Sequence, residues 1–152
     1  MYKTPIGVNN FFVNIVFFCV GSNRVTSDMF GSIVGSKLKK AGVRAFVYGS
    51  IDSPVNAINM DDYIVLIKSK HKNDIIFVID TMITANNLKK TFSFNKGSIV
   101  VAGMSLKREV GDYHITFNIK TKELYHVTKK QITASADKLS AFLIKNYKRI
   151  LM

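Results

Sequence analysis

The chain has 152 residues, of which 47% are hydrophobic and 21% charged, and this balance excludes an intrinsically disordered protein. Its 22 basic and 10 acidic residues give a net charge of +12, which raises the question of nucleic-acid binding. Because the lysines are scattered in ones and twos, we expect an acidic protein partner or a solvated cationic surface, and no specific nucleic acid.

The first predicted element is a buried strand over residues 11–20, an apolar run rich in β-branched and aromatic side chains. The run is too short to cross a bilayer, contains Asn14 and precedes no cleavage pattern, so we expect neither a signal peptide nor a membrane partner. A single cysteine, Cys19, fits a reducing compartment. We therefore expect a cytoplasmic protein.

A polar loop follows this strand and leads into a helix that ends at Gly42. Asp28 stands where the helix should begin, and two interpretations are open. As an N-cap, its carboxylate would accept a hydrogen bond from the first turn. As a functional residue, it would lie at the carboxyl edge of a parallel sheet, where sites form.

Strands and helices continue to alternate along the rest of the chain. We expect strands over residues 43–49, 75–80, 98–103 and 113–119, the last at an edge, loops over 81–87 and 104–110, and a helix over 56–70. Asp61 and Asp62 offer a later start for that helix. A final helix begins at Thr128, which forms a capping-box pair with Gln131. The alternation predicts one domain over residues 1–152, a three-layer α/β/α sandwich with a mostly parallel sheet.

Two carboxylates follow predicted strands and carry the candidate chemistry. Asp80 ends the most apolar strand, and the rules of open parallel sheets place it on the same rim as Asp28. Two close carboxylates do not both ionise freely, so the pair would supply an acid and a base. Asp52 and Asp112 lie at loop edges and are supporting candidates for the same rim. The alternative is that these aspartates are only caps and loop anchors.

Other chemistries find less support in the sequence. The chain has no glycine-rich phosphate loop and no nucleophile elbow. His114, on a predicted strand, would complete a metal set with Asp28 and Asp80, but a strand histidine is more often structural. We therefore expect no metal and no other cofactor. His71 stands in a lysine-rich turn, and we expect it to be exposed.

Four segments resemble, in the same order, the motifs of the YyaC family of sporulation proteins. They are residues 21–31 (GSNRVTSDMFG), 47–59 (VYGSIDSPVNAIN), 77–80 (FVID) and 110–116 (VGDYHIT). The first also resembles a loop of the spore germination protease, which degrades small acid-soluble spore proteins. The resemblance implies a hydrolase-like fold of the phosphorylase/hydrolase type, similar to hydrogenase maturation proteases. It also implies that Asp28 and Asp80 are catalytic. Asn23 and His114 are further supporting candidates.

The function implied is a sporulation-associated, aspartate-dependent endopeptidase that acts on a protein or peptide in the cytoplasm of a sporulating cell or forespore. The chain departs from the family motifs at Asn56, where they have histidine, and at Ser32, where they have proline. Two alternatives remain open. One is a catalytically silent, protein-binding member in sporulation, and the other is a metal-dependent maturation-type protease.

Overall fold

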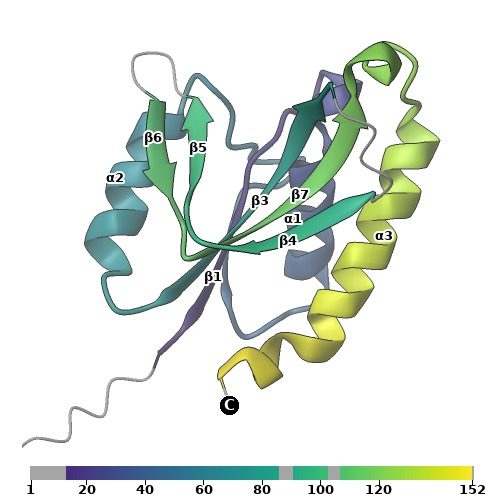
Figure 1. Ribbon diagram of the computed structural model, residues 1–152. Coiled ribbons are helices and arrows are strands. Elements are labelled where there is room, and N and C mark those ends of the chain that lie inside the picture. Colours follow the sequence, from purple (N-terminus) through teal and green to yellow (C-terminus); the bar gives the residue numbers. More distant parts are fainter. Residues whose placement is uncertain (1–12, 86–90, 103–106, 152) are drawn as a thin grey trace, which may run out of the picture.

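The computed structural model describes residues 13–85, 91–102 and 107–151 (Figure 1). The strands are β1 Ile15–Cys19, β2 Phe46–Tyr48, β3 Ile75–Thr84, β4 Phe92–Lys96, β5 Ile99–Ala102, β6 Lys107–Val110 and β7 Tyr113–Lys120. The helices are α1 Phe30–Lys40, α2 Met60–Lys70 and α3 Lys129–Asn146, and three short turns of 3-10 helix are η1 Thr26–Asp28, η2 Thr121–Glu123 and η3 Tyr147–Leu151.

A five-stranded sheet in the order β2-β1-β3-β7-β4 forms the middle layer, and only β4 runs antiparallel to its neighbour. Helices α1 and α3 cover one face, while α2 and the hairpin β5–β6 lie on the other (Figure 1). The expected three-layer sandwich with a mostly parallel sheet is therefore confirmed.

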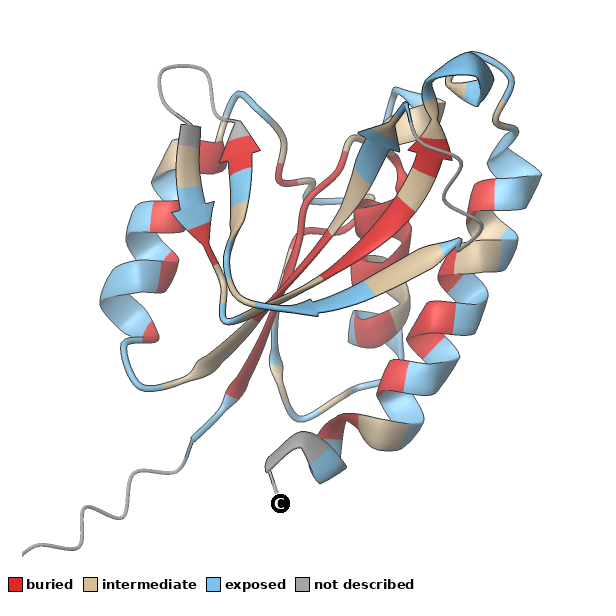
Figure 2. Ribbon diagram, viewed as in Figure 1, coloured by how far each residue is buried: buried red, intermediate tan, exposed pale blue. Residues whose placement is uncertain are grey.

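Alternation along the strands divides the core into two apolar clusters. Phe17 and Phe77 point towards α1 and α3, whereas Phe18 and Val78 point towards α2 and the hairpin. All of β1 is buried, so both faces of this strand are covered (Figure 2). This explains why its sequence is continuously apolar rather than alternating.

Several expectations about the second half of the sheet are wrong. β3 continues beyond Asp80 to Thr84, where a loop was expected, and β4 was not predicted. β7 lies between β3 and β4 rather than at an edge. Among the described strands β5 pairs with β6 alone, in a separate hairpin, and β6 occupies residues 107–110 of the expected loop 104–110. Residues 11–12, 86–87 and 103–106 of the expected elements lie outside the described part of the chain.

The helices follow the sequence more closely. α2 begins at Met60, so the later of its two expected starts is confirmed. Thr128 caps α3, and its side chain and that of Gln131 form both hydrogen bonds of the capping box. None of the described helices is both long enough and apolar enough to span a membrane.

Candidate active site

Asp80 lies where β3 extends past the end of β1. The register pairs Cys19 with Ile79, and the N–H of Val20 donates to the carbonyl oxygen of Ile79 at 2.8 Å. The next N–H on that side of β3, from Thr81, donates to Asp80 Oδ1 at 2.7 Å instead of to a strand. This bond draws the carboxyl group of Asp80 towards the end of β1.

Asp28 reaches the same rim because α1 begins directly on the ends of two strands. A Cβ atom on Gly31 would lie 2.0 Å from the carbonyl oxygen of Val20 and 2.9 Å from that of Ile79, so only glycine allows this approach. The N–H of Ser22 donates to the backbone carbonyl of Asp28 at 2.7 Å and closes the loop. Asp28 therefore stands in η1, immediately before the helix, over the ends of β1 and β3.

The N-cap interpretation of Asp28 is wrong. Met29 occupies the N-cap position of α1, and no side chain provides a capping hydrogen bond there. The carboxyl group of Asp28 is thus available for another role.

The pKa values of both carboxyl groups are raised, and Asp28 contributes to the rise at Asp80. Burial raises the pKa of Asp80 to about 8; the Thr81 N–H lowers it in part, and the negative charge of Asp28 raises it further. Burial also raises the pKa of Asp28, and the nearby N–H of Ser22 offsets part of that rise. At neutral pH Asp80 therefore keeps its proton, and of the two Asp28 is the group that ionises first.

A cleft of about 530 Å³ opens beside Asp28. Its walls come from the loop of residues 22–25 and from the segment that holds Pro54 and residues 56–58. Its volume falls within the usual range for ligand pockets. Asp80 is not among the residues that line this cleft.

The sequence analysis missed the apolar side chains that flank the cleft. Val25 and Ile58 are 56% and 79% exposed, and Arg24 lies beside Val25 in the cleft wall. A signal was present, because an apolar residue in an otherwise polar loop is exposed unless the fold covers it. What the sequence lacked was the spatial pairing of the two loops.

Two of the supporting candidates lie near this rim. The side-chain amide of Asn23 donates to the carbonyl oxygen of Ile51 at 3.1 Å and so joins the two loops of the cleft. Asp52 is the next residue after Ile51 and is exposed to solvent, although it does not line the cleft. Asn23 thus holds the cleft together, while Asp52 lies at its margin.

The expectation that Asp112 belongs to this rim is wrong. Its carboxyl oxygen accepts a hydrogen bond of 2.8 Å from the N–H of Ile76, near the start of β3. Asp112 also precedes β7, which is parallel to β3, so it lies at the amino edge of the sheet. Its carboxylate ties the two strands together and is remote from Asp28.

His114 does not join the two aspartates. The register pairs it with Val78, two residues before Asp80, and its Nδ1 lies 3.0 Å from the carbonyl oxygen of Gly97. Among the described residues, no group of three or more His, Cys, Asp and Glu side chains could hold a metal ion. The alternative metal set of Asp28, Asp80 and His114 is therefore not formed.

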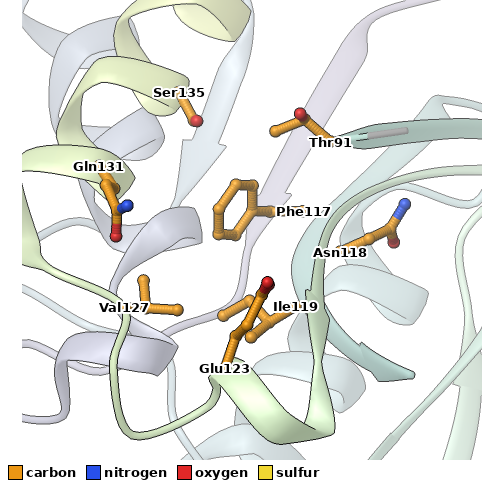
Figure 3. A pocket seen from close by; sticks show the side chains of 8 residues that line it. All are labelled: Thr91, Phe117, Asn118, Ile119, Glu123, Val127, Gln131 and Ser135. Carbon is orange, nitrogen blue, oxygen red and sulfur yellow. The ribbon is translucent and has the colours of Figure 1, made fainter. Parts of the chain in front are cut away.

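A second cavity of about 240 Å³ lies between β7 and the start of α3. In Figure 3 the ring of Phe117 points into it, with Val127, Gln131 and Glu123 around the ring. Glu123 is the one carboxyl group in its lining, so this cavity offers no acid–base pair comparable to Asp28 and Asp80.

Comparisons with known proteins agree with this fold. The crystal structure of the NiFe hydrogenase maturation protease HycI from Thermococcus kodakarensis KOD1 is similar, with a TM-score of 0.52 over 86% of this chain and 92% of HycI. The sequence identity is 13%, so the likeness concerns the fold alone. The expected similarity to hydrogenase maturation proteases in fold is confirmed.

Comparison of the sequence gives one curated relative and one matching family model. The uncharacterized protein YyaC of Bacillus subtilis (strain 168) is 36% identical over 105 residues, which make up 66% of this chain and 51% of YyaC. The chain thus matches about half the length of this relative. A family model described as "Protein of unknown function (DUF1256)" matches residues 6–144. The chain therefore belongs to the DUF1256 family, and the likeness to YyaC confirms the resemblance seen in the motifs.

Proposed function

We propose that the protein is an aspartate-dependent endopeptidase of sporulating cells, with Asp28 as the general base and Asp80 as the general acid. The observation that carries the proposal is the electrostatic coupling at the rim, where the charge of Asp28 contributes to a pKa of about 8 for Asp80. A carboxyl group that is neutral at pH 7 beside one that ionises more readily provides the two protonation states that water-mediated peptide hydrolysis needs.

The proposed reaction leaves both groups as they began. Asp28 removes a proton from water as the water oxygen bonds to the carbonyl carbon, and Asp80 donates its proton to the carbonyl oxygen. The resulting diol collapses as the C–N bond breaks. Asp28 then passes its proton to the leaving amine, and Asp80 regains one from the diol. This assignment follows from the raised pKa of Asp80, to which the negative charge of Asp28 contributes.

The cleft beside Asp28 fits an extended peptide better than a small polar molecule. Val25 and Ile58 offer exposed apolar contacts on its two walls, and Arg24 offers a cation for a carbonyl or carboxylate group. Its openness to solvent suits a segment of a larger chain. The hydrogenase maturation protease of similar fold and the resemblance to a spore protease support peptide hydrolysis as the reaction class.

The proposal is tested by proteolysis of small acid-soluble spore proteins, with the products identified by mass spectrometry. We expect cleavage by the wild type and a loss of rate of at least about a hundredfold in Asp28→Asn and in Asp80→Asn. Asp52→Asn, at the margin of the cleft, is the matched control and should cleave normally. An inert wild type, or variants as active as the wild type, would refute the proposal.

A second candidate function is a silent, peptide-binding member. It is favoured by the absence of Asp80 from the lining of the cleft and by Asn56, which lines the cleft where the family motif has histidine. This function predicts that the same substrates bind without cleavage, and that Asp80→Asn leaves their affinity unchanged.

A further inference from the structure

The far edge of the sheet carries a second feature, remote from Asp28. β4 pairs with β7 on one side, and no other described strand lies on its outer side (Figure 1). Open strand edges attract other extended chains, because their outward N–H and C=O groups lack partners.

The hydrogen bonds of β4 show which residues face outwards. The N–H of Asn118 donates to the carbonyl oxygen of Thr91, and the N–H of Gly97 donates to that of Asp112. In an antiparallel pair such bonds recur at every second residue, so the residues between them direct their backbone groups away from the partner strand. The outward backbone groups of β4 therefore belong to Phe92, Phe94 and Lys96.

An exposed aromatic pair lies beside this edge. Phe94 on β4 and Phe142 on α3 are 55% and 53% exposed, and their rings meet edge to face with centroids 5.9 Å apart. Next to them is a cavity of about 240 Å³, lined in part by Phe77, Phe94 and Tyr113. The cavity is large enough to take one apolar side chain.

Three positively charged side chains lie around the aromatic pair. Lys96 is two residues from Phe94 along the strand, and Lys138 and Lys145 lie four residues before and three after Phe142 on the exposed face of α3. The spacing of these two lysines places them on the same side of the helix as Phe142. The carboxylate of Asp137, on the same helix, is paired with Lys37 of α1 and does not neutralise them.

We propose that the β4 edge, with Phe94, Phe142 and the three lysines, is a docking site for an extended acidic segment of a partner protein. The segment adds to β4 as a strand, places one apolar side chain on the aromatic pair, and directs its carboxylates to the lysines. A second copy of this chain fits poorly, because it would oppose lysines to lysines. A lipid surface fits poorly as well, because it cannot pair the outward backbone groups. The proposal does not depend on peptidase activity.

The test uses a fluorescein-labelled peptide with alternating glutamate and leucine residues, and fluorescence anisotropy of the full chain as the readout. We expect binding in the range of about 10 to 100 µM, at least about tenfold tighter than for the lysine–leucine analogue or for a peptide of the same composition with its glutamates in one block. Equal binding of the blocked and alternating peptides would overturn the proposal, because it would indicate general attraction to a basic protein.

Variants locate the site. Phe142→Ser and Lys145→Glu should each weaken binding about tenfold, whereas Lys68→Glu on α2 makes the same change of charge elsewhere and should have little effect. Phe94→Pro removes an outward N–H without breaking the ladder and should abolish binding, while Phe94→Leu retains most of it. Unchanged binding by Phe142→Ser and Phe94→Pro would overturn the proposal. The proposal would also be overturned if the wild type formed a dimer, or bound phosphatidylglycerol vesicles, and the Phe142→Ser variant did not.

Discussion

Asp80 is held in a protonation state that differs from that of a free aspartate. Its pKa of about 8 results mainly from burial, and the hydrogen bond from the N–H of Thr81 is too little to offset it. A carboxyl group in such a position lowers the free energy of unfolding when the pH is high enough to ionise it. Such a cost is typical of functional positions, where chemistry and stability compete.

The pH dependence of stability should reveal this cost. Because the folded pKa of Asp80 lies above the unfolded value of about 4, its contribution to stability is complete below about pH 4 and is lost as the pH rises through about 8. Asp80→Asn removes the titration. We expect this variant to gain about 1 to 3 kcal/mol over the wild type between about pH 5 and about pH 9, in urea unfolding at a series of pH values.

Asp52→Asn is the control for this measurement, since that carboxyl group is exposed, and its stability curve should run parallel to that of the wild type. A parallel curve for Asp80→Asn would mean that the carboxyl group of Asp80 ionises in the fold without cost.

Single site residues could be predicted where a rule relates a position in the sequence to a position in the sheet. Asp28 follows β1, and Asp80 lies in β3 just past the last residue that pairs with β1. Because β1 and β3 are neighbours, the rule of the carboxyl edge located both residues. The same rule, applied strictly, would have placed Asp112 at the opposite edge, because it precedes a parallel strand. The expectation that His71 is exposed is wrong: it is buried, and its ring lies between the hydroxyl of Tyr48 and the carboxylate of Asp74. The contact with Tyr48, 23 residues away in the sequence, could not be predicted from the local pattern.

Helix α1 is placed by glycines that let it approach backbone directly. Gly31 packs against the ends of β1 and β3, and Gly35 packs against the carbonyl of Gly49, where a Cβ atom would lie 1.9 Å away. The rest of α1 is an ordinary amphipathic helix, in which Val34 and Leu38 are fully buried. The position of Asp28 over the sheet thus depends on close backbone contact rather than on side-chain packing alone.

Gly31→Ala should therefore be far more costly than its size suggests. The added methyl group would overlap the Val20 carbonyl, which is fixed in the sheet, so the start of α1 must move. We expect a loss of about 3 kcal/mol or more, measured as the shift of the urea unfolding midpoint.

Gly42→Ala is the matched control for Gly31→Ala. Gly42 has open space but a φ of +66°, so alanine there should cost only about 1 kcal/mol. If Gly31→Ala cost no more than Gly42→Ala, the close approach would not position α1.

Helices and strands whose own sequence has a clear pattern were predicted. Strands that form only because of their neighbours in the sheet were not. The apolar runs of β1 and β3 and the capped α3 carry their own signals. The alternation in β7 suggested an edge, yet its polar residues face a polar neighbour: Thr116 donates to Asn118 at 3.0 Å, and Asn118 donates to Ser93 of β4 at 2.7 Å. β4 itself is short and half polar, so only its pairing with β7 identifies it.

The architecture of the entire protein follows from the crossovers between its parallel strands. Two strand–helix units account for β1 to β3 with α1 and α2, and these were read correctly from hydrophobic periodicity. The hairpin β5–β6 interrupts the path from β4 to β7 and lies on the α2 face instead of extending the sheet. Nothing local in residues 98–110 indicates that choice, because a strand of a hairpin and a strand of a sheet have the same pattern.

The net charge of the chain affects the stability of its fold. With 22 basic and 10 acidic residues, at least 12 cations have no acidic counterpart, and they repel one another more in the compact state than in the unfolded chain. The exposed ion pair between Lys37 and Asp137 joins α1 to α3 but is worth little by itself. Added salt shortens the range of the repulsion and should stabilise the fold.

We therefore expect the melting temperature to rise as sodium chloride is increased from low to moderate concentration, by about 2 to 4 °C for each kcal/mol of repulsion removed. Lys122→Glu, in the exposed turn η2, replaces a positive by a negative charge without touching the core. Its melting temperature should be higher than that of the wild type at low salt and should rise less with added salt. Differential scanning calorimetry of both proteins measures the two slopes, and a melting temperature that falls with salt would show that attractive ion pairs outweigh the net repulsion.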